Sequence, residues 1–267
     1  MAIPRFDVLG VHVSALTIKD AVAEIGRWIE SREHHYVCVT GVHGVMESQR
    51  DADLKRIHNE SGLTTPDGMP MVWAGRWAGM AGMERVYGPD LMLAVAQQAV
   101  ARGWRFYLYG GRPGVAELLT RRLTERFPGL QIAGMYSPPF RPLTVTEDEA
   151  LIGRINAAAP DIVWVGLSTP KQERWMAAHV ARLGASALIG VGAAFDIHAG
   201  TLRQAPRWMR RSGLEWLFRM LMEPKRLARR YLSNNPRFVM EVLRRRPRPV
   251  EPDEMQATGL REANAEI

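Results

Sequence analysis

The sequence predicts an α/β fold: a mainly parallel sheet with helices on both faces, followed by a basic helical C-terminal appendage. Three observations support this prediction. Short apolar runs rich in β-branched residues alternate with segments of helical period through roughly the first 200 residues. Prolines stand where the helices of such an alternation should begin. From Pro206 onward the pattern is helical throughout and rich in arginine.

The alternation also gives the order of the elements. Thr17 is a candidate N-cap for the first helix, and Pro89, Pro113 and Pro170 each occupy the expected first turn of a later one. Because strands separated by helices pair in parallel, the sheet should be Rossmann-like, with ligands bound beyond the carboxyl ends of its strands. The buried strands are expected at Tyr36–Thr40, Trp104–Tyr109, Leu130–Gly134, Asp161–Leu167 and Ala185–Val191.

The composition predicts three regions. Residues 1–202 should form the α/β core, residues 203–248 a basic amphipathic helical appendage, and residues 249–267 an acidic tail expected to be disordered. The single cysteine, Cys38, excludes an internal disulfide, fits a reducing compartment and is expected to be inert core. No secretory signal or spanning segment is expected, so the protein should be cytoplasmic or lie on a membrane without crossing it.

The basic segment carries almost all of the charge imbalance. Fourteen basic residues but only three acids fall between Arg203 and Arg248, which gives it a formal charge of +11, whereas the whole chain carries +7. Such a segment must meet something anionic: a membrane surface, a phosphorylated substrate or a nucleic acid. Aromatic and leucine side chains interleave with the arginines. Pro224, Pro236 and Pro247 are expected to interrupt its helices.

A glycine-rich loop follows one predicted strand. Gly110 and Gly111 precede a helix that Pro113 should open, so backbone amides and the helix dipole could approach a phosphate group. The loop matches neither a Walker A motif nor a GxGxxG fingerprint, which disfavours an ATPase or a dehydrogenase. The alternative is a tight turn that needs glycine only for its backbone freedom.

Asp67 lies in a Thr-Pro-Asp-Gly loop among glycine, methionine and tryptophan. A partly buried carboxylate there could act as a general base. The alternative is an ordinary turn in which Asp67 caps the next helix. Arg85 and Asp90 follow shortly after. They are either polar groups of the same cleft or a local ion pair and an N-cap.

Two further loops offer polar side chains at expected strand ends. Gln172 and Glu173 open a helix and could reach a ligand, although Glu173 could equally be a favourable charge at a helix N-terminus. Asp196 follows a Gly-Ala-Ala-Phe run. The seven histidines show no metal-ligand spacing, and a single one such as His43 is more often structural. The sequence therefore predicts no metal site and no cofactor.

Three arginines of the basic segment share a helical spacing. At about 100° per residue, Arg219, Arg226 and Arg229 fall at roughly 0°, −20° and −80° on a straight helix, although Pro224 interrupts it. Guanidinium groups on one side suit a diphosphate or phospholipid headgroups. The alternative is a solvated arginine-rich face.

Several short motifs occur together and in one order. They are Thr65-Pro66-Asp67-Gly68, Arg85 with Gly88 and Asp90, Gly110-Gly111-Arg112-Pro113-Gly114, Pro170–Trp175, Val191–Asp196, Ala205-Pro206 with Trp208, Leu214–Arg219, Glu223-Pro224 and Arg229–Tyr231. With these motifs in this order, the chain resembles the WecG/TagA/CpsF family of bacterial glycosyltransferases over about residues 5–235.

The resemblance implies an inverting, metal-independent transfer of a sugar from a UDP-sugar to a polyprenyl-diphosphate-linked acceptor at the cytoplasmic membrane. The product would belong to a surface polysaccharide, either an exopolysaccharide or one of the teichoic-acid-like or enterobacterial-antigen-like kind. Asp67 would be the general base, with Thr40 and Arg85 in the same pocket. The nucleotide-sugar would be bordered by Gly110, Gly111, Gln172, Glu173 and Asp196, with Asp90 also binding substrate.

The resemblance further implies that Arg219, Arg226 and Arg229 close over the active site and bind diphosphate. Two positions depart from the family pattern. Members often have Thr-x-Asn at the end of the second strand, whereas Thr40 is here followed by Gly-Val-His, with His43 nearby. Gln204 stands where arginine is usual.

Two rival functions remain at this point. A nucleic-acid-binding protein would use the +11 segment as its footprint, and a non-catalytic scaffold would bind a nucleotide-sugar without turnover. Residues 1–202 carry no net charge, and three of their loops follow strand ends and suit a small ligand. Both observations favour the enzyme over a nucleic-acid-binding protein. Its expected partners are a UDP-sugar, the lipid-linked acceptor and an anionic membrane surface, with no nucleic acid. A homo-oligomer is left open.

Overall fold

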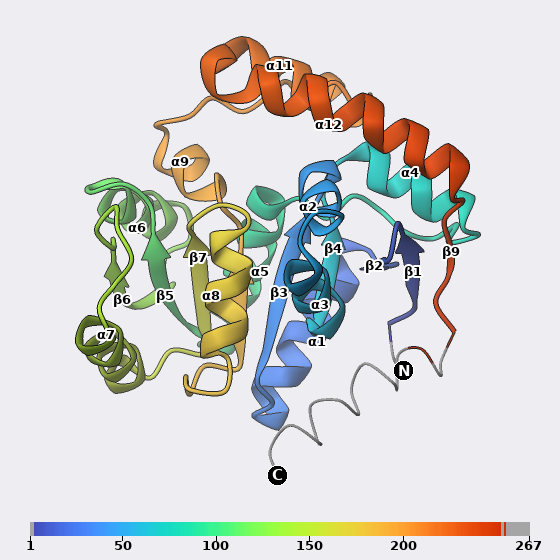
Figure 1. Cartoon of the computed structure of the whole chain (residues 1–267). Helices are drawn as coiled ribbons and strands as arrows, with labels where there is room; N and C mark the ends of the chain where they lie inside the picture. Colours follow the sequence, from blue (N-terminus) through green and yellow to red (C-terminus); the bar gives the residue numbers. More distant parts are fainter. Residues whose placement is uncertain (1–2, 252–253, 255–267) are drawn as a thin grey trace. The chain divides into compact units, whose positions relative to one another are not determined.

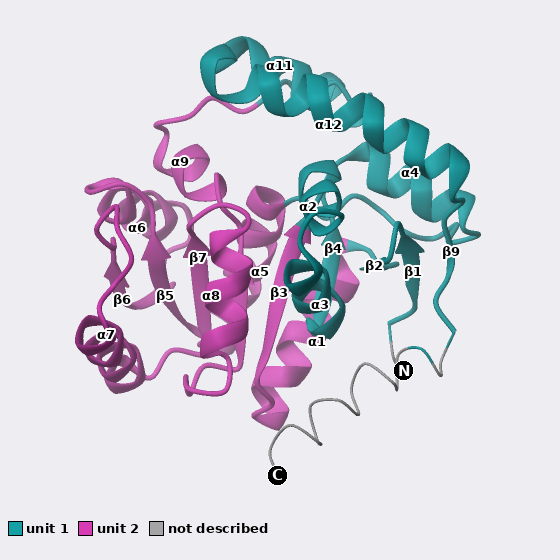
Figure 2. Ribbon diagram, viewed as in Figure 1, with its two compact units in different colours: residues 1–17, 40–87, 205–267 teal, residues 18–39, 88–204 magenta. Residues whose placement is uncertain are grey.

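The computed structural model describes residues 3–251 and residue 254. The chain divides into two compact units (Figure 2). Unit 1 combines residues 1–17, 40–87 and 205–267, and unit 2 combines residues 18–39 and 88–204. Unit 1 therefore joins both ends of the chain with a central segment.

Unit 2 alternates helices and strands, as Figure 1 shows along the chain. Its strands are β3 (His35–Thr40, whose last residue belongs to unit 1), β5 (Arg105–Gly110), β6 (Gln131–Tyr136), β7 (Ile162–Gly166) and β8 (Ala187–Gly190). Its helices are α1 (Ile18–Ser31), α5 (Gly88–Arg102), α6 (Val115–Arg126), α7 (Val145–Ala158), α8 (Lys171–His179) and α9 (Ala194–Ala199).

These strands pair in parallel in the order β3-β8-β7-β5-β6, within a six-stranded sheet that β4 (Leu63–Pro66) completes. The side chains of β7 and β8 are almost all buried, as expected for parallel strands covered on both faces. The helices form two series by contact: α1, α5, α9 and α6 in one, and α7 with α8 in the other. The predicted α/β class is confirmed.

Unit 1 contains a smaller antiparallel sheet with the order β2-β1-β9. A two-residue turn at Leu9 and Gly10, both with positive φ, joins the first two strands, which is the turn that suits a twisted hairpin. The strands are β1 (Arg5–Val8), β2 (Val11–Ser14) and β9 (Arg248–Pro249). The helices are α2 (Val42–Ser48), α3 (Ala52–Glu60), α4 (Met69–Trp77), α10 (Arg207–Arg211), α11 (Glu215–Met222) and α12 (Pro224–Arg244).

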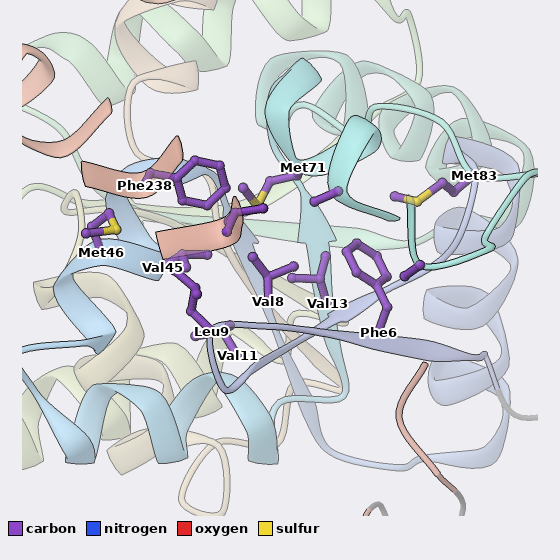
Figure 3. Packing of buried hydrophobic residues seen from close by; sticks show 13 residues of the cluster. Phe6, Val8, Leu9, Val11, Val13, Val45, Met46, Met71, Met83 and Phe238 are labelled. Carbon is purple, nitrogen blue, oxygen red and sulfur yellow. The ribbon is translucent and has the colours of Figure 1, made fainter. Parts of the chain in front are cut away.

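The core of unit 1 draws on both ends of the chain (Figure 3). Apolar side chains of the β1–β2 hairpin pack with residues of α2 and α4, and α12 adds Phe238 and Val242. All of them are buried. The basic segment is thus anchored in a hydrophobic core through one face of its longest helix.

The structure confirms the five predicted strands to within three residues at each end. Pro89 and Pro170 stand at the start of α5 and α8, while Pro113 precedes α6 by two residues. The expectation that Pro236 interrupts a helix is wrong, because α12 continues through it. The buried positions on both sides of Pro236 keep the helix packed although one backbone hydrogen bond is lost.

Most of residues 249–267, the tail expected to be disordered, falls outside the described residues. Its first residues are described, and they are ordered by pairing. Pro249 and Arg248 lie opposite Phe6 and Asp7 of β1, and Val250 N donates to Arg5 O at 2.9 Å.

Removing the Phe238 ring should destabilise unit 1. Phe238 is 5% exposed in the core of Figure 3, so Phe238→Ala leaves a cavity and should lower the free energy of unfolding by about 3 kcal/mol or more. The matched control is Val239→Ala, at a position 54% exposed on the same helix, which should change it by about 0.5 kcal/mol or less. Urea unfolding followed by circular dichroism measures both. Equal losses would show that α12 is not part of this core.

Candidate functional site

The loop of Asp67 is fixed by its backbone in unit 1. Asp67 follows β4 directly, and its N–H donates to Thr40 O at 2.9 Å. A Cβ on Gly41 would lie 2.7 Å from Asp67 O, so no larger residue fits there without moving this loop. The N-cap of α4 is Gly68 with φ 90°, so Asp67 does not occupy the capping position. Its side chain is half-buried, which is the setting expected for a general base.

The side chain of Thr40 is buried in unit 1. Thr40 is 2% exposed, and its Oγ1 makes no hydrogen bond. A Cβ on Gly44 would touch both Thr40 Cγ2 and His58 Nε2, so these two side chains share one space. His58 Nδ1 lies 2.9 Å from Leu54 O, and burial lowers the pKa of His58. The free Thr40 hydroxyl is therefore a buried donor beside a neutral imidazole.

Arg85 is held by an acid from the basic segment. Arg85 Nη1 donates to Glu215 Oε2 at 2.7 Å, and the two side chains are 13% and 16% exposed. The Arg85 guanidinium also stands 4.5 Å from the centre of the Tyr87 ring. Val86 N donates to Pro66 O, which sets this segment alongside the Asp67 loop.

Tyr87 and Arg219 complete this group. Burial raises the pKa of Tyr87 well above its usual value, and the charges of Glu215 and Asp67 raise it further. Burial lowers the pKa of Arg219, but Tyr231, Tyr87 and the two carboxylates outweigh it, so the net shift is upward. Unit 1 therefore brings together Asp67, Thr40, Arg85 and Arg219 of the predicted site.

The other two predicted arginines have different surroundings. Arg226 pairs with Glu223 on the surface, and Arg229 is exposed. Because α11 and α12 are separate helices, the single arc expected for Arg219, Arg226 and Arg229 does not exist as one helix face. Their binding role stays a prediction.

His43 faces the C-terminal helix. His43 Nδ1 lies 3.4 Å from Asn234 Nδ2, and Asn234 Oδ1 accepts from Arg50 at 3.1 Å. Asn234 is 4% exposed on α12. Burial lowers the pKa of His43 to about 4, with the charges of Arg230 and Arg50 adding to it. His43 is thus neutral at pH 7, and its Nδ1 accepts the amide hydrogen of Asn234.

The glycine loop of unit 2 is packed tightly. A Cβ on Gly110 would lie 2.7 Å from Gly166 O, and Gly111 N donates to the same oxygen at 3.1 Å. Both glycines have positive φ. A Cβ on Gly166 would in turn lie 2.8 Å from the Phe195 ring. The glycines are therefore required by the fold, and one loop amide is already used within the sheet.

Asp196 is connected to the glycine loop. Its Oδ1 accepts from Arg112 at 3.1 Å and from Thr201 Oγ1 at 3.0 Å. Arg112 is otherwise largely exposed. The structure thus brings Asp196 together with the loop of Gly110 and Gly111. Its carboxylate orients the one arginine of that loop.

Gln172 and Glu173 are both buried at the start of α8. Glu173 Oε1 accepts from Thr169 Oγ1 at 2.8 Å and from Gln172 Nε2 at 3.1 Å. Glu173 Oε2 and Gln172 Oε1 are buried without a hydrogen-bond partner. Burial raises the pKa of Glu173. Glu173 lies in the first turn of α8, as the alternative of a favourable charge at a helix N-terminus requires, but its side chain is fully buried. Its role in binding stays a prediction.

Asp90 lies in the first turn of α5, half-buried. Its charge raises the pKa of His198, whose Nε2 is 2.9 Å from Pro89 O, although burial lowers that pKa overall. Among the described residues no group of three or more His, Cys, Asp or Glu side chains is arranged to hold a metal ion.

Sequence reasoning missed Glu215, Tyr87 and Asn234 as members of the unit 1 group. One feature of the sequence could have pointed to Glu215: it is one of only three acids in the basic segment of residues 203–248. An acid retained among many arginines often pairs with a specific one. Asn234 had no such feature, because its partners His43 and Arg50 are distant in the chain. Tyr87 is two residues from Arg85, but nothing in the sequence showed that its ring would lie under that guanidinium group.

The neutral state of His43 predicts a pH dependence. Its pKa is about 4 folded against 6.5 unfolded, so between these values the unfolded chain binds more protons and stability falls as pH falls. The His43→Gln variant lacks this titrating group. The difference between the wild-type and variant melting temperatures should therefore change between pH 6.5 and pH 4. Differential scanning calorimetry at fixed ionic strength measures it. A gap that is constant over this range would contradict the buried neutral imidazole.

Comparisons with known proteins show which family the chain belongs to. The model of the glycosyl transferase WecG/TagA/CpsF family matches residues 6–251. The chain is 29% identical over 196 residues to the N-acetylglucosaminyldiphosphoundecaprenol N-acetyl-beta-D-mannosaminyltransferase of Bacillus subtilis (strain 168), covering 73% of each chain. It is 25% identical over 240 residues to the protein of that name from Staphylococcus aureus (strain MW2), covering 89% of this chain and 92% of the relative. The chain therefore belongs to the WecG/TagA/CpsF family and is a glycosyltransferase.

Proposed function

We propose that this enzyme is an inverting, metal-independent glycosyltransferase that moves a sugar from a UDP-sugar to a polyprenyl-diphosphate-linked acceptor in surface polysaccharide synthesis. The observation that carries the proposal is the half-buried carboxylate of Asp67, whose loop is fixed against Thr40 and whose charge acts on Arg219 and Tyr87. A carboxylate so placed in a member of this family is suited to deprotonate a sugar hydroxyl.

The acceptor class is supported by the relatives. The names of these two relatives specify an undecaprenol-diphosphate-linked N-acetylglucosamine as acceptor and a beta-linked product. The likeness to the relative from Staphylococcus aureus covers 89% of this chain, and the family match over residues 6–251 includes Thr40, Asp67 and Arg85. We therefore assign a lipid-linked sugar diphosphate as the acceptor of this enzyme.

The reaction is a single displacement. The Asp67 carboxylate takes the proton of the acceptor hydroxyl as its oxygen forms a bond to the anomeric carbon of the donor. The bond from that carbon to UDP breaks on the opposite side, and UDP leaves with the electron pair. Attack opposite to the leaving group inverts the configuration, which turns an alpha-linked donor into a beta-linked product. Arginine side chains neutralise the charge that develops on the diphosphate.

Unit 2 has the groups that we assign to the nucleotide-sugar. Gly110 and Gly111 bring the backbone close to a ligand, and Asp196 orients Arg112 beside them. The buried oxygens of Gln172 and Glu173 lack donors, and sugar hydroxyl groups or a uracil N–H could supply them. We assign Asp90 to the same substrate.

We also propose that the enzyme is peripheral on the inner face of the cell membrane. Among the described residues no helix is long and apolar enough to cross a bilayer. One face of α12 instead exposes four apolar side chains at helical spacing: Leu232, Val239, Met240 and Leu243. An apolar helix face within an arginine-rich segment suits an anionic bilayer surface, since burial and electrostatic attraction then add.

Asp67→Asn should lower kcat for sugar transfer by about 10²- to 10⁴-fold with little change in the KM for the donor, because the amide cannot accept the proton. The assay pairs UDP-sugars with short-chain polyprenyl-diphosphate-linked sugars, with and without EDTA. The matched control is Asp53→Asn on the exposed surface of α3, which should retain wild-type rates. Unimpaired transfer by Asp67→Asn would refute its role as the base, and salt-sensitive nucleic-acid binding without transfer would favour the rival function.

Replacing two residues of the exposed face of α12 should weaken membrane binding. Leu232→Ser with Leu243→Ser, both 63% exposed, should reduce binding to vesicles of phosphatidylglycerol and phosphatidylethanolamine by about tenfold or more. The matched control is Phe140→Ser with Val145→Ser, two exposed apolar residues of unit 2. Vesicle flotation measures both variants. If both double variants bound the vesicles equally well, the membrane contact would lie outside this face of α12.

A further inference from the structure

Thr40 and His58 each have a buried polar atom that makes no hydrogen bond among the residues that the structure describes. The two atoms are Thr40 Oγ1 at the end of β3 and His58 Nε2 on α3. Both residues belong to unit 1, and they are 2% and 0% exposed. A buried polar atom without a partner costs free energy, because water no longer solvates it. Two such atoms that lie close together therefore favour a bond to each other, provided that one donates and the other accepts.

The imidazole ring of His58 offers an acceptor. Its Nδ1 lies 2.9 Å from Leu54 O, and a carbonyl oxygen can only accept, so Nδ1 carries the hydrogen. Ser48 Oγ lies 3.3 Å from Nδ1 and donates to Gly44 O at 2.9 Å, so it too can accept from Nδ1. Burial lowers the pKa of His58, so the ring is neutral at pH 7 and Nε2 keeps its lone pair. The Thr40 hydroxyl has a hydrogen that this lone pair can accept.

The two side chains meet over Gly44 of α2. A Cβ on Gly44 would lie 2.9 Å from Thr40 Cγ2 and 3.5 Å from His58 Nε2. A rotation of about 120° about χ1 brings the Oγ1 of a threonine to the position that its Cγ2 had. After this rotation, donor and acceptor both adjoin the point where Gly44 lacks a side chain. Glycine at this position therefore leaves room for a hydrogen bond between Thr40 and His58.

Thr40 supports the loop of Asp67 through its backbone. Thr40 O accepts from Asp67 N at 2.9 Å, and the next residue, Gly41, fits directly against Asp67 O. A change in the orientation of Thr40 is therefore passed on to this loop. A general base must lie within hydrogen-bond reach of the proton that it takes, and a displacement of about 1 Å can lower the rate about 10²-fold.

We propose that His58 is a further positioning residue for sugar transfer, whose Nε2 accepts the Thr40 hydroxyl hydrogen and so holds the end of β3 against the Asp67 loop. Because Thr40 Oγ1 is buried, the hydroxyl acts on Asp67 through the backbone rather than by touching the substrate. The family resemblance assigns no role to His58. The inference rests on the proposed function for the role of Asp67 as the base.

Two substitutions of His58 separate the acceptor from the rest of the ring. In His58→Gln the amide oxygen can take the place of Nε2, whereas in His58→Asn the shorter amide reaches only the position of Nδ1. We expect His58→Asn to lower kcat about tenfold with an unchanged KM for the donor, and His58→Gln to stay within about threefold of wild type. In the Thr40→Val background the two substitutions should have equal effects, because the donor is already removed.

Gly44→Ala tests the same contact and leaves both polar groups in place. The added methyl group fills the space between Thr40 and His58, so we expect the same loss of kcat as in His58→Asn. The matched control is Gly153→Ala on α7, where a Cβ meets no heavy atom within 4 Å and wild-type rates are expected. Thermal melting of each variant shows whether it is folded.

Nitrogen-15 NMR of the full-length protein labelled at histidine tests the contact without turnover. We expect His58 to be the tautomer with hydrogen on Nδ1, and its Nε2 resonance to shift in Thr40→Val but not in the control Thr124→Val on α6. This measurement and Gly44→Ala decide the question if His58→Asn does not fold.

Three results would overturn the proposal: wild-type kcat in His58→Asn, equal losses in His58→Asn and His58→Gln, or an Nε2 resonance that does not depend on Thr40. A resonance that depends on Thr40 in a protein that transfers no sugar would contradict only the proposed function. Sugar transfer without that dependence would contradict only this inference.

Discussion

The ion pair between Arg85 and Glu215 is the constraint on which the candidate site of unit 1 depends. It joins the segment beside the Asp67 loop to the first turn of α11, 130 residues later in the chain. Both side chains are mostly buried, so the loss of either partner would leave an uncompensated charge in a poorly solvated place. The ion pair also determines which groups are left to interact with Arg219. Because Glu215 is engaged by Arg85, Arg219 is left to interact with Tyr231, Tyr87 and Asp67 at longer range.

The +11 segment uses its cations in different ways. Arg226 pairs with Glu223, the residue before α12, and Arg237 lies 3.8 Å from Glu241 of the same helix. Such surface pairs contribute little free energy. Arg246 stands over the ring of Trp77, so part of its side chain covers an aromatic surface of α4. The Arg230 guanidinium stands 5.1 Å from the centre of the Tyr231 ring. The excess positive charge is therefore not spread evenly over the segment, because these arginines have different partners.

Most of the sheet could be predicted from the sequence, because β5, β7 and β8 are continuous apolar runs between helical segments. The β1–β2 hairpin could not, since its two strands have only four residues each and its turn contains Leu9 in a left-handed conformation. The position of Asp67 directly after a strand was visible in the sequence. Its surroundings were not, because Glu215 and Tyr231 lie far along the chain. The helical spacing of the arginines also could not show which side of α12 is buried, which depends on Leu227, Asn234, Phe238 and Val242.

The core that unites the first strands with the last helix has a consequence for biosynthesis. A ribosome makes the β1–β2 hairpin first, but Phe238 and Val242 are added only near the end of the chain. Unit 2, apart from its first helix and strand, is made in one continuous stretch and can acquire its contacts earlier. The apolar side chains of the β1–β2 hairpin, α2 and α4 that pack with α12 therefore stay exposed until α12 leaves the ribosome. A chain that stops before that point lacks Phe238 and Val242, so the core of unit 1 stays incomplete until synthesis is almost finished.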